Sequence, residues 1–397
     1  MTSREHLDLE KVRQDTPGTR TRIHLNNAGA SLIPSPVYQA VVEHLDLEMQ
    51  IGGYEAHKRA MPAFERTYDA IAEMVNCSRD EIALMENATA AWMTAFHGLN
   101  LQAGDKILTA EAEYASNAIT YLQAAQDKGV ILEVIPSDAA GQIDVAALEA
   151  RIDAQTKLIS ISHIPTNGGL INPAEEVGKV ARKHGIPYLL DACQSVGQIP
   201  LDVQKIGCDM LSATGRKYLR GPRGTGFLYV RGDFLNRLTP PWLDLHGAKW
   251  TSANSFTMRS DARRFENWEF NVAAVIGLGV AVDYYLAQGP SACSERLCSL
   301  AAAARAELER LPHVTVTDIG ARKGGMVTFS HDRYSAEDIR EKLAARGINV
   351  STSSPASTRF DMDRRGLETI VRASFHYYNT EDELKQFAAE VANLQEN

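Results

Sequence analysis

Lys217 is the residue whose surroundings first suggest chemistry. It lies in a glycine-rich stretch, residues 212–226, that follows a short apolar run. A lysine held in a cramped, partly desolvated loop has a lowered pKa, and its neutral amine can then form a Schiff base. Taken alone, the residue could equally be a solvated surface lysine. The stretch does not contain the GxxxxGK[ST] pattern of a nucleotide-binding P-loop, so nucleotide phosphates are not its expected ligand.

Two further polar segments also follow apolar runs. Asp191 ends the run that starts at Tyr188. A carboxylate at the end of a buried strand is costly unless it meets a positive group, so Asp191 either binds a cation or caps the next turn. Thr89 follows Asn87 and Ala88 at the start of a helical pattern. Free amides and a hydroxyl at a helix N-terminus suit a phosphate, although threonine is also a common N-cap without any ligand.

The elements that must position these residues alternate between residues 78 and 230. The expected strands are residues 81–85, 106–109, 130–135, 158–163, 188–191, 210–213 and 226–230. The expected helices between them are residues 90–99, 116–126, 145–152 and 175–184. Such alternation predicts an α/β fold with a mostly parallel sheet covered on both faces. Ligands of these folds lie at the carboxyl ends of the strands, where all three polar segments fall.

A smaller α/β unit is expected after a helix at residues 272–287, because Gly289 and Pro290 break the helical pattern. Its expected helices are residues 291–311, 336–346 and 381–394, and its expected strands lie near residues 314, 326, 349 and 369–374. Residues 236–264 show no clear period, and we expect them to form a long functional loop.

Composition excludes several classes of protein. Hydrophobic residues make up 44% and charged residues 23% of the 397 residues, as in soluble globular proteins. A net charge of −9 without a large basic cluster argues against nucleic-acid binding. Residues 1–15 lack the apolar core of a signal peptide, and residues 272–282 are too short to span a bilayer, so we expect a cytoplasmic protein without membrane contact. Five cysteines without CxxC spacing predict neither disulfides nor a metal site.

Taken together, the polar segments resemble the class V aminotransferase family of pyridoxal-phosphate (PLP) enzymes. This family includes cysteine desulfurases, selenocysteine lyases and isopenicillin N epimerases. The most diagnostic parts are Asp191-Ala192-Cys193-Gln194 and the hydroxyl–x–x–lysine pattern from Thr214 to Lys217. The likeness extends from residues 24–29 to residues 372–374.

The resemblance implies fold type I of the PLP-dependent transferases. It has a large domain with a mostly parallel seven-stranded sheet and a small C-terminal α/β domain. In this chain the implied division is an N-terminal segment, 1–35, that packs with the small domain, a PLP-binding domain, 36–288, and the small domain, 289–397. Family members are usually homodimers with active sites near the subunit interface, and we expect the same here.

The resemblance also assigns roles to the cofactor-binding residues. Lys217 forms the Schiff base with PLP and moves the Cα proton. Asp191 keeps the pyridine nitrogen protonated, so that the ring acts as an electron sink. Gln194 hydrogen-bonds the phenolic oxygen of PLP. The residues expected to hold the phosphate are Ala88 through its backbone, Thr89 and Thr214.

A second group of residues would contact the ring or the amino-acid substrate. Tyr114 stands where the family usually stacks a histidine on the ring, although it could instead be a core aromatic at a helix start. Arg372 would bind the substrate carboxylate, because a guanidinium pairs with a carboxylate through two hydrogen bonds; a surface salt bridge is the alternative. Thr166 or Asn167 would lie near ring and substrate, and Asn27 near the substrate.

Besides Tyr114, two further positions depart from the family pattern. Arg216 stands where the family often has a histidine. Residues 264–269 lack the threonine that family members commonly contribute to the phosphate site of the partner subunit. The ligand that would replace this threonine is not defined by the sequence.

The cofactor residues do not select the reaction, since transamination, racemisation and β-elimination share them. Cysteine desulfurases carry a cysteine in a loop shortly before the substrate arginine, and residues 350–359 contain none. We therefore expect a C–S lyase that acts on a cysteine-derived substrate or its sulfoxide and yields pyruvate and ammonia. Residues 24–29, 165–169 and 372–380 look similar to ergothioneine-pathway sulfoxide lyases.

Two alternative functions remain open. An amino-acid epimerase or an aminotransferase uses the same cofactor residues. An epimerase would also need a second base, for which Tyr114 and His376 are candidates. A non-catalytic PLP-fold binding protein is the other alternative, against which intact Lys217 and Asp191 argue.

Overall fold

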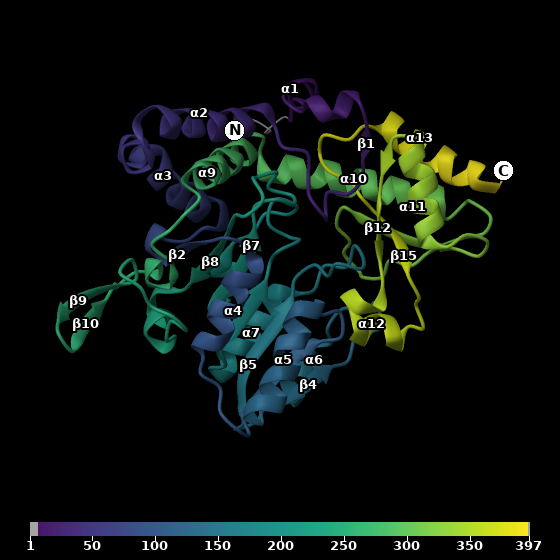
Figure 1. The fold of residues 1–397 in the computed structure, drawn as a ribbon. Helices are drawn as coiled ribbons and strands as arrows, with labels where there is room; N and C mark the ends of the chain where they lie inside the picture. Colours follow the sequence, from purple (N-terminus) through teal and green to yellow (C-terminus); the bar gives the residue numbers. More distant parts are fainter. Residues whose placement is uncertain (1–6, 396–397) are drawn as a thin grey trace, which may run out of the picture.

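The computed structural model describes residues 7–395, which form a large and a smaller α/β unit (Figure 1). A seven-stranded sheet in the order β2-β8-β7-β6-β5-β3-β4 organises the large unit. Its strands are β2 (Ile82–Met85), β3 (Lys106–Ala110), β4 (Ile131–Ile135), β5 (Thr156–Ser162), β6 (Tyr188–Asp191), β7 (Met210–Thr214) and β8 (Gly226–Val230). Only β8 runs antiparallel to its neighbours, so the expected mostly parallel sheet of seven strands is confirmed.

Both faces of this sheet are buried, which explains why its strands read as continuous apolar runs. Successive residues of β6 belong to different cores: Leu190 packs into one apolar cluster and Leu189 into the other. Parallel strands covered by crossover helices have this pattern because neither face meets water. The connecting helices are α4 (Ala88–Gly98), α5 (Ala115–Lys128), α6 (Val145–Ala150), α7 (Ala174–His184) and the short α8 (Val203–Ile206).

Two long N-terminal helices that were not among the expected elements cover one end of the sheet. They are α2 (Ser35–Ile51) and α3 (Gly53–Val75), and both pack against α9 (Val272–Ala287) (Figure 1). The approach is close at two glycines of α9. A Cβ at Gly277 would lie 2.6 Å from Val41, and one at Gly279 would lie 2.4 Å from Thr67. These glycines therefore serve helix packing.

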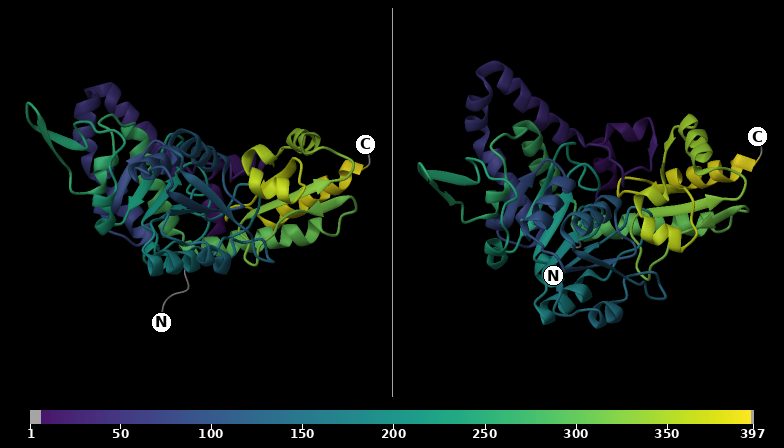
Figure 2. Two further views of the ribbon diagram at one scale, coloured as in Figure 1. Left: turned by 90° about the horizontal axis from the view of Figure 1, so that it is seen from below. Right: turned by 60° about the horizontal axis from the view of Figure 1, so that its bottom comes forward.

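The expectation of an irregular loop at residues 236–264 is wrong in part. This stretch contains a β-hairpin of β9 (Ala248–Ser252) and β10 (Ser255–Met258), which extends away from the body of the molecule (Figures 1 and 2). Most of the hairpin's residues are exposed on both faces, including Trp250 and Phe256. Because no core imposes alternation on such strands, the sequence shows no period-2 pattern.

The smaller unit is built on an antiparallel sheet in the order β11-β12-β15-β14. Its strands are β11 (Val314–Val316), β12 (Met326–His331), β14 (Ser351–Ser353) and β15 (Ile370–Ser374). Its helices are α10 (Pro290–Leu308), α11 (Ala336–Ala345), α12 (Arg359–Arg364) and α13 (Glu381–Ala392).

The N-terminal segment lies against this smaller unit. After the short helix α1 (Leu9–Gln14), strand β1 (Ile23–His24) pairs in parallel with β13 (Ile348–Asn349). An isolated bridge joins Asn26 to Ser374. Residues 1–6 of the segment lie outside the described residues, and the domain limits drawn from the sequence stay a prediction.

Within residues 7–395, no single helix is long and apolar enough to cross a membrane. Helices α9 and α10 meet that criterion only when they are joined, and the chain bends by 81° between them.

Candidate active site

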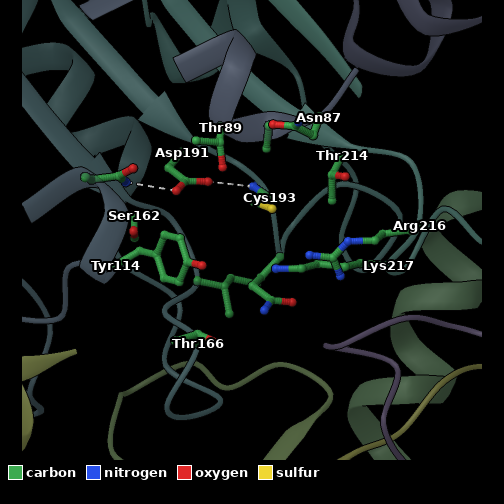
Figure 3. A pocket seen from close by; sticks show the side chains of 14 residues that line it. Asn87, Thr89, Tyr114, Ser162, Thr166, Asp191, Cys193, Thr214, Arg216 and Lys217 are labelled. Carbon is green, nitrogen blue, oxygen red and sulfur yellow. Dashed lines mark hydrogen bonds between the residues drawn. The ribbon is translucent and has the colours of Figure 1, made fainter. Parts of the chain in front are cut away.

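A cavity of about 420 Å³ opens at the carboxyl ends of the central strands and the N-terminus of α4 (Figure 3). Every residue expected to bind the cofactor lines it. The lining residues are Asn87, Ala88, Thr89, Tyr114, Asn117, Ser162, Ile164, Thr166, Asp191, Cys193, Gln194, Thr214, Arg216 and Lys217. They come from segments far apart in sequence and meet because parallel strands end at the same edge of the sheet.

Lys217 enters the cavity from the loop that follows β7. Backbone hydrogen bonds from Gly215 to Thr225 and from Gly221 to Gly215 close this loop, which buries the lysine. Burial lowers the pKa of Lys217, and the nearby charge of Arg216 acts in the same direction. A lowered pKa increases the fraction of neutral amine, which is the form that attacks an aldehyde carbon.

Asp191 is buried at the end of β6 and held by two donors. Asn117 Nδ2 donates to its Oδ2 at 2.9 Å, and the Cys193 backbone N–H donates to its Oδ1 at 2.9 Å. Burial raises the pKa of Asp191. Among the described residues, no basic side chain forms an ion pair with it. The carboxylate thus caps its turn and still lacks the cationic partner that a buried charge calls for.

The N-terminus of α4, which lines the cavity through Ala88 and Thr89, suits a phosphate. Asn87 caps α4 by accepting a hydrogen bond from the Ala90 N–H at 2.9 Å. The first helical amides, those of Ala88 and Thr89, have no partner within the helix and point out of its N-terminus. Thr214 ends β7 and lines the same cavity (Figure 3).

Gln194 supplies a further sign that the cavity takes a ligand. Its Nε2 donates to the Ala28 carbonyl at 3.2 Å, while its buried Oε1 has no partner. Buried polar atoms are rarely left unpaired in native proteins, so a bound group is expected to complete this one. Three features together fit PLP: a carboxylate at Asp191 without an ion-pair partner among the described residues, a buried amine at Lys217 and the free amides at the N-terminus of α4. They match its pyridinium, aldehyde and phosphate respectively.

Arg372 meets the cavity from the smaller unit. Its Nη1 donates to the carbonyl and the Oγ1 of Thr166, at 2.9 and 2.7 Å, and its buried Nε has no partner. Arg372 itself is not among the lining residues, but the pKa of Lys217 is lowered by its charge as well as by burial.

Three residues named from the sequence have other contacts. Asn27 is buried and donates to the carbonyls of His24 and Ser374, at 3.2 and 2.7 Å, so its amide ties the N-terminal segment to β15. Asn167 donates to Asp361 at 2.7 Å. His376 stacks on Tyr218, with ring centroids 5.5 Å apart. None of the three lines the cavity, so their contact with a substrate stays a prediction.

Several lining residues were not singled out from the sequence. Asn117 lies in the first turn of α5, and its side chain reaches back to Glu113, which precedes the helix. Ser162 ends β5. Cys193 is a free cysteine beside Lys217, and burial raises the pKa of its thiol. Its place between Asp191 and Gln194 in the diagnostic segment was the available signal.

Arg216, the departure from the family pattern, also lines the cavity (Figure 3). Its Nη1 donates to the Gly29 carbonyl, which links the lysine loop to the N-terminal segment. Across residues 7–395, no three His, Cys, Asp or Glu side chains are grouped so as to hold a metal ion.

Comparison with known proteins agrees with this geometry. The model of the class V aminotransferase family matches residues 23–387, and the chain belongs to this family. It is therefore a PLP-dependent enzyme of fold type I, as the resemblance implied.

Its sequence identity to individual relatives is modest, but the similarity extends over nearly the whole chain. A probable cysteine desulfurase of Methanothermobacter thermautotrophicus is 28% identical, with 96% of each chain covered. The apo structure of a cysteine desulfurase from Thermococcus onnurineus has a TM-score of 0.91 at 28% identity, with 99% of each chain covered. The structure of the cystine C–S lyase C-DES with cysteine persulfide has a TM-score of 0.86 at 25% identity. It covers 95% of this chain and 99% of that chain.

Proposed function

We propose that the protein is a C–S lyase that eliminates a sulfur group from Cβ of a cysteine-derived amino acid or its sulfoxide. The observation that carries this proposal is the segment before Arg372. Residues 350–359 form β14 and a 3₁₀ turn (Pro355–Ser357) and contain no cysteine that could take up sulfur. Elimination needs no such thiol, because the sulfur group leaves with the electron pair of the C–S bond. The 2-aminoacrylate released then hydrolyses to pyruvate and ammonia.

The role proposed for each cavity residue follows from its position. Bound PLP supplies an electron sink for the negative charge that develops at the substrate Cα. The buried amine of Lys217 holds the cofactor covalently and, once displaced by substrate, takes the Cα proton. Asp191 keeps a proton on the pyridine nitrogen, and Tyr114 packs on the ring. Gln194 holds the phenolic oxygen.

Substrate binding is assigned to Arg372. Thr166 anchors Nη1, so the guanidinium is held in one orientation. Its unpartnered Nε N–H is then available to a carboxylate that approaches from the cavity. A guanidinium and a carboxylate form two parallel hydrogen bonds, which fixes the orientation of the substrate as well as its charge.

We also propose a homodimer. Large apolar side chains are exposed on the hairpin and nearby (Trp250, Phe256, Met258, Trp268) and on α2 and α3 (Tyr38, Met49, Tyr54). Apolar surface on this scale usually marks a protein interface, and a second copy of the chain is the expected partner. A location in the cytoplasm is also proposed, because the thiols of Cys77, Cys193, Cys208 and Cys298 are free and a reducing compartment keeps thiols in that form.

Product analysis tests the reaction. The PLP-loaded protein is incubated with L-cysteine, L-cystine, S-alkylcysteines and their sulfoxides, and pyruvate, alanine and ammonia are quantified. A lyase forms pyruvate and ammonia in equal amounts without any keto-acid acceptor. Alanine together with a protein-bound persulfide would instead show a desulfurase, the activity named for several relatives. Exchange of the Cα hydrogen in heavy water without pyruvate would show an epimerase or an aminotransferase.

A further inference from the structure

Glu113 is a buried carboxyl directly behind the cavity wall. Only 1% of its surface is exposed, and it is not among the lining residues. Its Oε1 nevertheless accepts hydrogen bonds from three residues that do line the cavity. The donors are the Tyr114 N–H at 2.7 Å, Asn117 Nδ2 at 3.0 Å and Ser162 Oγ at 2.5 Å.

Asn117 connects this carboxyl to Asp191. Its Nδ2 carries two hydrogens, and the amide donates to both Glu113 Oε1 and Asp191 Oδ2, the latter at 2.9 Å. With both hydrogens used, the amide cannot rotate without breaking a buried hydrogen bond. The side chain of Asp191 is thereby held in the orientation that faces the cavity.

The other oxygen of Glu113 fixes the carboxyl itself. Oε2 accepts from Thr109 Oγ1 at 2.9 Å and, more weakly, from the Tyr121 hydroxyl at 3.5 Å. Thr109 belongs to β3 and Tyr121 to α5, while Ser162 ends β5. The carboxyl is therefore bound to β3, α5 and β5 of the large unit. Because its own position is fixed, it also restricts the movement of the lining residues that donate to it.

Burying the carboxyl of Glu113 costs free energy in its ionised form. Burial raises the pKa of Glu113 to about 7, and the charge of Asp191 acts in the same direction. Asp191 is the charged group that faces it; the neighbours from β3, β5 and α5 are hydroxyls and amides. Core packing alone would be served better by an apolar side chain. A carboxyl retained here points to a task that needs its acceptor oxygens.

We propose that Glu113 is a positioning residue of the cofactor site, which holds Tyr114 directly and Asp191 through Asn117. The bond from Glu113 fixes the Tyr114 N–H, and with it the backbone at the start of α5 from which this partly exposed side chain projects. Without Glu113, Asp191 would lose the donor that orients its Oδ2. The inference rests on the cofactor site proposed above and not on the choice among reactions.

The test compares two buried glutamates. Glu113→Gln keeps the shape of the side chain but exchanges one acceptor oxygen for a donor. Glu383→Gln is the matched control: Glu383 is 8% exposed and accepts from Arg13 Nη1 at 2.8 Å and from Asn379 Nδ2 at 2.8 Å, but it lies on α13 of the smaller unit and does not line the cavity. The dissociation constant of PLP is measured by titrating apo-protein, and the visible circular dichroism of the bound cofactor reports its orientation.

We expect Glu113→Gln to weaken PLP binding about tenfold, the effect of one disturbed buried hydrogen bond, and to change the circular dichroism. Glu383→Gln should leave both unchanged. If Glu113→Gln binds PLP as the wild type does, or if both variants weaken binding equally, the inference is overturned.

A second variant keeps the test decisive if Glu113→Gln does not fold. Asn117→Ala leaves Glu113 in place and removes the bridge to Asp191, and it should weaken PLP binding in the same way; an unchanged dissociation constant would overturn the inference. Neither measurement uses turnover. A wild type that binds PLP but forms no pyruvate would therefore contradict the lyase proposal and leave this inference standing.

Discussion

Arg372 Nη1 donates to both the carbonyl and the Oγ1 of Thr166, a residue 206 positions earlier in the chain. Arg372 belongs to β15 of the smaller unit, and Thr166 follows β5 of the large one. The pair thus joins the two units at the edge of the cavity. The Nε of the same guanidinium is buried and has no hydrogen-bond partner among the described residues.

We expect Arg372→Lys to raise KM for amino-acid substrates by roughly 10- to 100-fold, the effect of losing a charge-assisted pair of hydrogen bonds. The value of kcat should fall less, because the lysine keeps the charge but not the paired geometry. Steady-state kinetics measure both. Thr166→Ala is the companion variant and should have a smaller effect, since it only frees the guanidinium. An unchanged KM in Arg372→Lys would remove this residue from the substrate site.

Lys217→Ala should abolish covalent attachment of PLP and lower turnover by on the order of 10³-fold or more, because the amine both holds the cofactor and moves the proton. Borohydride reduction followed by mass spectrometry measures the attachment. Lys205→Ala is the control: Lys205 is exposed and pairs with Asp202 at 3.6 Å, away from the cavity. Attachment of PLP to another lysine in the wild type would contradict the assignment.

The raised pKa of Glu113 predicts how stability depends on pH. The carboxyl keeps its proton up to about pH 7 in the folded protein, against an ordinary value of 4.5. The stability it contributes is therefore complete below pH 4.5 and is lost as pH rises through 7. In the apo-proteins, the free energy of unfolding of the wild type minus that of Glu113→Gln should decline by on the order of 3 kcal/mol between pH 4.5 and pH 7, at 1.36 kcal/mol per pKa unit.

Urea unfolding of both apo-proteins at several pH values between 4.5 and 8 measures this difference. Glu383→Gln again serves as the control for a buried glutamate elsewhere. Parallel stability curves for wild type and Glu113→Gln would show that Glu113 titrates at the same pH in the folded and unfolded chains.

The hairpin provides a test of the dimer. The double substitution Trp250→Asp and Phe256→Asp places two charges on an exposed apolar surface and should convert the protein to a monomer, because unpaired charges are costly to bury in an interface. Light scattering coupled to gel filtration measures the mass. Ile131→Asp is the control: Ile131 is 42% exposed, but it lies on the edge strand β4. A dimeric double variant, or a monomeric wild type, would contradict the prediction.

Cys193 allows the lyase and desulfurase reactions to be separated. It is a thiol that lines the cavity, and burial raises its pKa, so it is a poor nucleophile. We expect Cys193→Ser still to form pyruvate as its main product, with no protein-bound persulfide in either form. A persulfide on Cys193 of the wild type, together with alanine, would identify this cysteine as a sulfur acceptor.

The strands of the sheet and the polar residues at their ends could be predicted from the sequence, because each strand leaves its own local pattern of apolar residues. Strand β6 was placed with its observed bounds, Tyr188–Asp191, since a strand buried on both faces reads as an unbroken apolar run. The hairpin at residues 248–258 was missed for the opposite reason: its side chains meet no core, so burial leaves no pattern.

Residue types and their order along the chain determined which chemistry was available: an amine after β7, a carboxylate after β6 and a helix end for phosphate. Only the tertiary structure decided which side chains meet at the cavity and support these groups. Glu113 supports the cavity only because Asn117 and Ser162 converge on it from different elements. Asn27, in a motif of the family, proved to have its amide occupied by backbone carbonyls. Contacts of this kind depend on the packing of segments distant in sequence, and no local period or spacing encodes them.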